Sequence, residues 1–186
     1  MNGAKKRETK YMVKKIVVIG PESTGKSTLC TQLAAHYHTI WVPEYARDYL
    51  LTNGADYSFE NLLTIAKGQL ALEDNLIKTI NKTTVFIDTD MYVMKVWCEY
   101  VFNKCHQFII DEIVAREYDL YLLCNVDLPW TKDALREYPD EGPRIELFNM
   151  YKDILANQNT PWAIISGTET ERLNNTIQVI NTTLKL

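Results

Sequence analysis

The segment GPESTGKS at residues 20–27 constrains the fold more than any other part of this chain. It fits the pattern G-x-x-x-x-G-K-[ST], a loop whose backbone N–H groups cradle nucleotide phosphates. An apolar, β-branched run at 15–19 precedes the loop and predicts a buried strand. After the loop, Leu29, Leu33 and Ala34 recur at helical spacing. Strand, glycine loop and helix in this order are the context that the phosphate-binding pattern requires.

The chemistry expected of this loop is electrostatic. Gly20 and Gly25 allow backbone angles that let successive N–H groups point into one concavity, and the following helix adds the positive end of its dipole. Lys26 is expected to reach the β- and γ-phosphates of ATP and to act in catalysis, and the Ser27 hydroxyl is expected to ligate Mg²⁺. The predicted nucleotide-binding residues of the loop are Gly20, Pro21, Glu22, Ser23, Thr24, Gly25, Lys26, Ser27 and Thr28.

Apolar strands and amphipathic helices alternate along the rest of the chain. The predicted strands lie at 39–42, 84–87, 120–124 and 162–165, and the helices at 59–81, 91–103, 107–116, 144–157 and 169–184, with one short helix within 125–143. This alternation predicts an α/β fold, a three-layer P-loop NTPase sandwich with a five-stranded, mainly parallel sheet, helices on both faces and a small lid. We expect a flexible basic tail at 1–14 and one domain at 15–186.

Composition narrows the class of protein. A hydrophobic fraction of 46% is enough for a sizeable core, and a net charge of −4 gives no basic footprint for nucleic acid. No apolar stretch is long enough for a signal peptide or a membrane span, which predicts a cytoplasmic protein. Four cysteines without a C-x-x-C pair, together with three histidines, offer no metal-ligand spacing, so reduced thiols are expected. The sequence leaves the oligomeric state open.

Two acids follow the predicted third strand. Asp88 comes directly after the apolar run at 84–87, at the carboxyl edge of the sheet, where an acid can hold Mg²⁺ against the phosphates or accept a proton. Asp90 lies two residues farther on and is expected to face the acceptor hydroxyl or a ribose. The alternative for Asp90 is a helix cap, since a helix is predicted to begin at Met91.

Two further segments carry charged residues at the same edge. In the EYARDY segment, Glu44 can accept a proton or hold ribose hydroxyls and Arg47 can meet a phosphate oxygen; the alternative is an ordinary helix N-terminus. After the fourth strand, the segment 127–144 is expected to form a mobile lid in which Arg136 and Arg144 neutralise charge on a transferring phosphoryl group. Arg136 is also expected to contact the nucleotide. An ordinary solvated face is the alternative for the lid.

The order of the motifs resembles one known family. GPESTGKSTL, WVPEYARDYL, AKGQLALED, FIDTDMYVMKVWCEY and LLCNVDLPWTKDALR occur here one after another. Together they resemble the ribosylnicotinamide (nicotinamide riboside) kinase domain of the bacterial NadR-type NAD-salvage proteins, over nearly the whole chain from about Val13. The resemblance implies transfer of the ATP γ-phosphate to the 5′-hydroxyl of nicotinamide riboside, which gives nicotinamide mononucleotide.

The same resemblance implies roles for individual residues. Lys26 and Ser27 would be the phosphate and Mg²⁺ residues, and Asp88 the metal-site or base carboxylate. The acceptor side would be formed by Glu44, Tyr45, Arg47, Gln69 and Asp90, and the lid would contribute Trp130 and Arg136. Physical chemistry agrees in part, because the pyridinium cation of nicotinamide riboside is well held between aromatic faces. The aromatic residues expected near that edge are Tyr45, Tyr49, Tyr92, Trp97 and Trp130.

The chain also differs from the larger members of this family. Those members carry a DNA-binding helix-turn-helix and an adenylyltransferase domain with a histidine-containing motif, and neither pattern occurs in this sequence. Neither regulation through DNA binding nor adenylyl transfer is therefore expected of this chain. Pro43 stands where some members have an aromatic residue before the Glu-Tyr pair, which leaves the shape of the base pocket open. Two other functions remain, a kinase of another small metabolite and a nucleotide-dependent regulatory ATPase.

Overall fold

The computed structural model describes residues 13–185 and places five strands in one sheet. The strands are β1 (Lys14–Ile19), β2 (Trp41–Val42), β3 (Thr84–Asp88), β4 (Leu120–Cys124) and β5 (Trp162–Ile165). Their order across the sheet is β2-β3-β1-β4-β5, and every neighbouring pair is parallel. The predicted P-loop NTPase architecture is confirmed. The second strand is shorter than predicted, because the Thr39 N–H bonds the Ala34 carbonyl at 2.9 Å and so stays with the end of the preceding helix.

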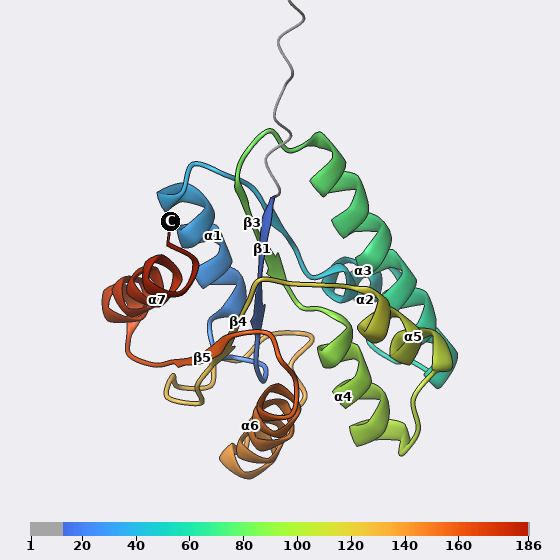
Figure 1. Cartoon of the computed structure of the whole chain (residues 1–186). Helices are drawn as coiled ribbons and strands as arrows, with labels where there is room; N and C mark the ends of the chain where they lie inside the picture. The colour runs from blue at the N-terminus through green and yellow to red at the C-terminus, as the bar shows by residue number, and fades with distance from the viewer. Residues whose placement is uncertain (1–12, 186) are drawn as a thin grey trace, which may run out of the picture.

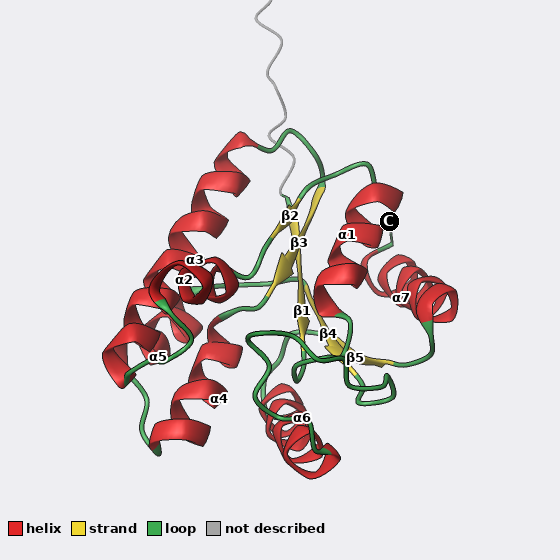
Figure 2. Ribbon diagram, turned by 180° about the vertical axis from the view of Figure 1, so that it is seen from behind, coloured by secondary structure: helices red, strands yellow, loops and turns green. Residues whose placement is uncertain are grey.

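Helices cover both faces of this sheet. They are α1 (Lys26–His36), α2 (Tyr45–Asn53), α3 (Phe59–Thr79), α4 (Met91–Phe102), α5 (Gln107–Ala115), α6 (Glu141–Ala156) and α7 (Glu169–Leu184). Helices α1 and α7 pack on one face, while α3, α4 and α6 contribute to the core on the other (Figure 1). Figure 2 shows the same layers from behind, with α2 and α5 packed against α3 and α4. Among the described residues, no helix combines the length and the apolar character needed to cross a membrane.

The two halves of the core follow from the alternation of side chains along each strand. In β1, Ile16 and Val18 point to the side of α1 and α7, whereas Val17 and Ile19 point to the opposite side. All four side chains are fully buried, as expected for a central parallel strand that is covered on both faces.

Several segments differ from the sequence-based expectation. The predicted short helix is wrong, because residues 125–140 form a lid without helix or strand. Helix α6 begins at Glu141, three residues before the predicted start, since Pro143 is tolerated in the first turn of a helix. The predicted tail lies outside the described residues except at its end, where Lys14 is already the first residue of β1.

The parallel arrangement brings the functional segments to one edge of the sheet. Strand β1 lies between β3 and β4, and Val18 pairs in register with Asp88. The loop that leaves β1 therefore starts beside the acid that ends β3. Helix α2 begins at the same edge, after β2. In open α/β sheets, ligands bind at the carboxyl ends of the strands, where the connections run to opposite sides.

Gly68 in α3 tests the packing behind this edge, because it lies against the ring of Tyr45 in α2. A Cβ added at Gly68 would lie 2.1 Å from Cε1 of Tyr45, whereas one at Gly142 in α6 would meet nothing within 4 Å. We expect Gly68→Ala to lower the free energy of unfolding by about 1–3 kcal/mol, as overpacking does. Gly142→Ala, the matched control, should be neutral or stabilising by up to about 1 kcal/mol. Urea unfolding measures both, and equal effects would contradict the tight contact.

Candidate active site

The phosphate loop enters α1 with backbone angles that favour glycine. Gly20 has a φ of +144° and Gly25 a φ of +79°. A Cβ at Gly20 would lie 2.9 Å from the carbonyl oxygen of Cys124, so a larger residue would collide with β4. Gly25 is also the N-cap of α1 and offers no side-chain cap, which leaves the first N–H groups of the helix for an anion.

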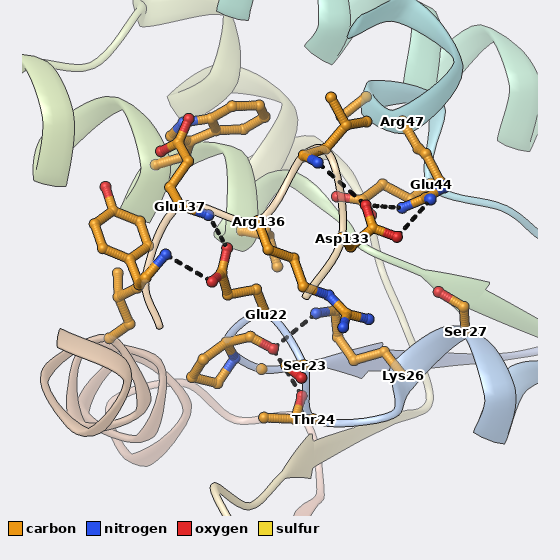
Figure 3. A pocket seen from close by; sticks show the side chains of 18 of the residues that line it. Glu22, Ser23, Thr24, Lys26, Ser27, Glu44, Arg47, Asp133, Arg136 and Glu137 are labelled. Atoms are coloured by element: carbon orange, nitrogen blue, oxygen red, sulfur yellow. Dashed lines mark hydrogen bonds and ion pairs between the residues drawn. The ribbon is translucent and has the colours of Figure 1, made fainter. Parts of the chain in front are cut away.

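Side chains within the loop hold it in shape. The Thr24 hydroxyl donates to the Pro21 carbonyl at 2.7 Å, and the Lys26 ammonium donates to the same carbonyl at 2.9 Å (Figure 3). Thr24 is fully buried and fixes the turn, whereas Lys26 is half-buried and lies across the loop. A bound phosphate would give Lys26 a charged acceptor in place of a neutral carbonyl, and such hydrogen bonds are stronger.

Asp88 meets Ser27 where β3 approaches the start of α1. The Ser27 hydroxyl donates to Oδ2 of Asp88 at 2.5 Å. Oδ1 of Asp88 is buried and has no hydrogen-bond partner among the described residues. The pKa of Asp88 is raised to about 7, mainly because burial disfavours the charged carboxylate and secondly because Glu44 carries a negative charge. A buried carboxylate oxygen without a partner, beside a serine hydroxyl, fits a hard cation such as Mg²⁺.

Asp90 points away from Asp88, although only one residue separates them. Thr89 lies between them with a φ of +78°, a left-handed conformation that is unusual for a β-branched residue. Asp90 caps α4: its Oδ1 accepts two backbone N–H groups of the first turn, and its Oδ2 accepts the hydroxyl of Tyr121 at 2.8 Å. Of the two predictions for Asp90, the helix cap is the one that its contacts match.

Gln69 is buried in α3 and joins the start of α2 to the end of β3. Its Oε1 accepts the backbone N–H of Tyr45 at 2.7 Å. Its Nε2 donates to the carbonyl of Pro43 at 3.3 Å and to that of Asp88 at 3.5 Å. Gln69 therefore holds the start of α2 against the end of β3.

A cavity of about 450 Å³ lies over the phosphate loop. Residues 20–28 form one side of it. The other lining residues are Glu44, Ala46, Arg47 and Leu50 near α2, Val93, Trp97 and Tyr100 from α4, Asp133, Leu135, Arg136, Glu137 and Tyr138 from the lid, and Leu147 and Tyr151 from α6. The structure thus brings Glu44, Arg47 and Arg136 together with the loop. The predicted residues that stand outside the lining are Tyr45, Gln69, Asp88, Asp90, Trp130 and Arg144.

The aromatic residues of the cavity are mostly ones that the sequence did not indicate. Of the five that were expected, Trp97 alone lines the cavity; the three additional rings are those of Tyr100, Tyr138 and Tyr151. Helical spacing from Val93 through Trp97 could have identified Tyr100, because residues three and four apart share a helix face. No local pattern marks Tyr138 in the lid or Tyr151 in α6, since their place depends on how these segments fold over the sheet.

The lid is attached to α2 and, through Tyr57, to α4 by two sets of contacts. Arg47 forms a two-pronged ion pair with Asp133, at 3.1 and 2.8 Å, and this hydrogen bonding lowers the pKa of Asp133 to about 2. Glu137 accepts the Tyr57 hydroxyl at 3.1 Å, and the Tyr57 oxygen accepts the indole N–H of Trp97 at 2.8 Å. Arg47 therefore binds a lid carboxylate here, where the sequence predicted a phosphate oxygen.

The two arginines that the sequence predicted in the lid have different surroundings. Arg136 is half-buried, bonds a lid carbonyl, and points toward the phosphate loop and Lys26 (Figure 3). Arg144 is buried near the start of α6, and its Nη2 donates to the Ser23 carbonyl at 3.4 Å and to a lid carbonyl at 3.2 Å. Arg136 is thus directed at the phosphate loop, whereas Arg144 bonds backbone carbonyls of the loop and of the lid.

Comparison with known proteins agrees with this geometry. Residues 15–172 match the AAA domain family. The chain belongs to this family. Within it, the chain is 31% identical over 153 residues to the trifunctional NAD biosynthesis/regulator protein NadR of Escherichia coli K12, and equally to NadR of Salmonella typhimurium LT2. The match covers 80% of this AAA-domain chain but 37% of each NadR protein, so the chain spans little more than a third of these relatives.

Solved structures give the same fold. A NadR protein in complex with NR superimposes with a TM-score of 0.79 at 22% identity, covering 94% of this chain and 50% of that one. A NadR protein in complex with NAD and AMP-PNP gives a TM-score of 0.74 at 20% identity, with the same coverage. Thymidylate kinase from Ehrlichia chaffeensis gives 0.60 at 15% identity, covering 91% of this chain and 99% of that one. The resemblance to NadR-type proteins that the motifs predicted is confirmed.

The buried environment of Asp90 gives a prediction about pH. Burial raises the pKa of Asp90 to about 7, against about 4 in an unfolded chain. Between these values the folded protein holds a proton that the unfolded chain releases, so the free energy of unfolding falls as pH rises from about 4 to about 7. Asp90→Asn cannot titrate and should remove up to about 1.4 kcal/mol of this fall per pH unit. Urea unfolding across that range measures it, and a difference between wild type and variant that is independent of pH would contradict the prediction.

Proposed function

We propose that this chain is an ATP-dependent kinase that phosphorylates the 5′-hydroxyl of nicotinamide riboside to give nicotinamide mononucleotide. The observation that carries the proposal is one cavity shared by a phosphate loop, the charges of Glu44 and Arg47, and four aromatic rings. The likeness to NadR proteins, one of them solved with NR and another with NAD and AMP-PNP, supports a nucleotide donor and a nucleoside acceptor. We place the reaction in the cytoplasm, where the four free cysteines would stay reduced.

On the donor side, ATP would lie on the phosphate loop with Lys26 at its β- and γ-phosphates. Ser27 and Asp88 would hold Mg²⁺, because the unpartnered Oδ1 of Asp88 provides an oxygen for the cation or for a water bound to it. Residues 13–185 contain no cluster of three or more His, Cys, Asp or Glu side chains suited to a metal, so the remaining ligands would be phosphate and water. When bound, Mg²⁺ neutralises charge on the β- and γ-phosphates.

The reaction is a displacement at the γ-phosphorus. The acceptor 5′-oxygen forms a bond to phosphorus while the bond to the leaving ADP oxygen breaks, and the hydroxyl proton passes to a carboxylate. Glu44 is our candidate for that base, because it lines the same cavity as the loop. Arg136 would stabilise the charge on the transferring phosphoryl group from the lid side.

On the acceptor side, the rings of Trp97, Tyr100, Tyr138 and Tyr151 line the cavity, and π faces turned into it would hold a flat cation. The negative charge of Glu44 adds attraction for the same cation. We assign Tyr45, Gln69 and Asp90 to the support of this wall, since their contacts fix α2 and α4 from behind the cavity. Arg47 and Trp130 would hold the lid in place over the substrates.

A second candidate is a kinase of another nucleoside or nucleotide. The fold shared with thymidylate kinase and with deoxyadenosine kinase from M. mycoides favours it. The choice of acceptor separates the two candidates, because only a pocket built for a cation gains from both the rings and the acid.

Asp88→Asn tests the donor side, because it keeps the shape of the side chain and removes its charge. We expect turnover to fall by about 10²-fold or more, the scale of losing one electrostatic or acid–base contributor. Without nucleotide at about pH 8, the variant should melt at an equal or higher temperature, because the wild-type carboxylate is buried with one oxygen unpaired. Phosphorylation kinetics and calorimetry measure the two effects. Normal turnover would remove Asp88 from the reaction.

The acceptor is tested by comparing nicotinamide riboside with the neutral nucleoside uridine. Cation–π contact of about 0.5–2 kcal/mol should give nicotinamide riboside a kcat/KM about 2- to 30-fold higher. Glu44→Gln should reduce kcat/KM for nicotinamide riboside much more than it weakens ATP binding, because Glu44 lies on the acceptor side.

Asp48→Asn is the matched control for this assay. Asp48 is an exposed acid in the first turn of α2 and does not line the cavity, so its loss of charge should change neither value. A preference for uridine, or an equal loss of ATP affinity in Glu44→Gln, would reject nicotinamide riboside as the acceptor.

A further inference from the structure

Glu22 belongs to the phosphate loop, yet its carboxylate is bound by the lid. Oε1 accepts the indole N–H of Trp130 at 3.0 Å and the backbone N–H of Tyr138 at 2.7 Å, and Oε2 accepts the backbone N–H of Glu137 at 2.9 Å. Figure 3 shows the two hydrogen bonds that run from backbone N–H groups of the lid to this carboxylate. Both oxygens of this acid are therefore engaged by donors from the lid.

The next residue of the loop adds to this attachment. The Ser23 hydroxyl accepts the Thr131 N–H at 2.9 Å and donates to the Pro129 carbonyl at 3.4 Å. Because residues 125–140 contain no helix or strand, contacts of this kind fix the path of the lid. Hydrogen bonds to a charged acceptor are the stronger ones, so Glu22 is the main point of attachment on the loop.

Arg136 lies between two such attachments. It immediately precedes the two residues whose backbone N–H groups bind Glu22, and its side chain points toward the loop (Figure 3). Three residues before it, Asp133 is paired with Arg47 at the start of α2. The position of the Arg136 guanidinium is thus set by the phosphate loop on one side, through Glu22, and by the start of α2 on the other, through Arg47.

We propose that Glu22 is a positioning residue, which fastens the lid to the phosphate loop and so sets Arg136 over the transferring phosphoryl group. The role of Arg136 in this proposal rests on the proposed function. The same bonds also limit electrostatic repulsion at the loop, because the carboxylate of Glu22 without them would repel ATP. The three N–H donors hold the charge of Glu22 toward the lid and away from the phosphate site.

The first test measures backbone amide exchange in the full chain without nucleotide. In Glu22→Ala the amides of Glu137 and Tyr138 lose their acceptor, and their exchange should rise about tenfold or more. Asp140→Asn is the matched control, because it removes the same charge from the N-cap of α6, where the side chain makes no cap hydrogen bond. Unchanged exchange in Glu22→Ala, or an equal rise in the control, overturns the attachment.

The second test is a double-mutant cycle between Glu22 and Arg136 in nicotinamide riboside phosphorylation. Each alanine variant should lower kcat about tenfold or more, with a smaller change in the KM for ATP, and the double variant should be no slower than Arg136→Ala alone. The positioning role is overturned if the fold-losses in kcat of the two single variants multiply in the double variant. It is also overturned if kcat is unchanged in Glu22→Ala. If Glu22→Ala does not fold, Trp130→Phe removes one of the three donors and should show smaller changes in both exchange and kcat.

The two tests separate this proposal from the proposed function. Amide exchange is measured without substrate, so this test of the attachment does not depend on the identity of the acceptor. If exchange rises in Glu22→Ala but the wild type does not phosphorylate nicotinamide riboside, the proposed function fails and the attachment stands. The cycle is then measured on ATP hydrolysis by released phosphate, and multiplied losses there again overturn the positioning role.

Discussion

Strand β1 pairs with β3 on one side and with β4 on the other, and the arrangement of the site depends on these two ladders. Because β1 is central and buried, the loop that leaves its end starts from a fixed point. Pairing with β4 brings Gly20 against the Cys124 carbonyl, and pairing with β3 brings Asp88 within reach of Ser27. The charged groups are therefore placed by backbone hydrogen bonds and apolar packing that exist before any ligand binds.

Most of the fold could be predicted from the sequence, because its signals are local. The loop pattern, the apolar strands and the helical spacing each span fewer than about twenty residues, and the parallel topology follows from their alternation. The same logic located Glu44 and Arg47, which follow a strand and so lie at the carboxyl edge. It failed for the short helix within 125–143, where the path of the chain depends on tertiary contacts with the loop and not on helical periodicity.

The parts of the site that escaped prediction are long-range contacts. Glu22 and its three lid donors are separated by 108 to 116 residues, and nothing near Glu22 in the sequence indicates them. Asp90 illustrates a different difficulty. An acid two residues after a strand can face a ligand or cap the next helix, and the left-handed turn at Thr89 that decides between them has no sequence signal in a β-branched residue.

Two of the three donors to Glu22 are backbone N–H groups, which every residue except proline carries. This attachment makes little demand on which amino acids stand at positions 137 and 138, and a strict demand on how many residues separate them from Trp130. Among relatives that share it, this stretch should keep its length and exclude proline at those two positions, whichever side chains its other contacts require. Such a constraint leaves its trace in the absence of insertions and deletions, which a comparison based on residue identity alone does not register.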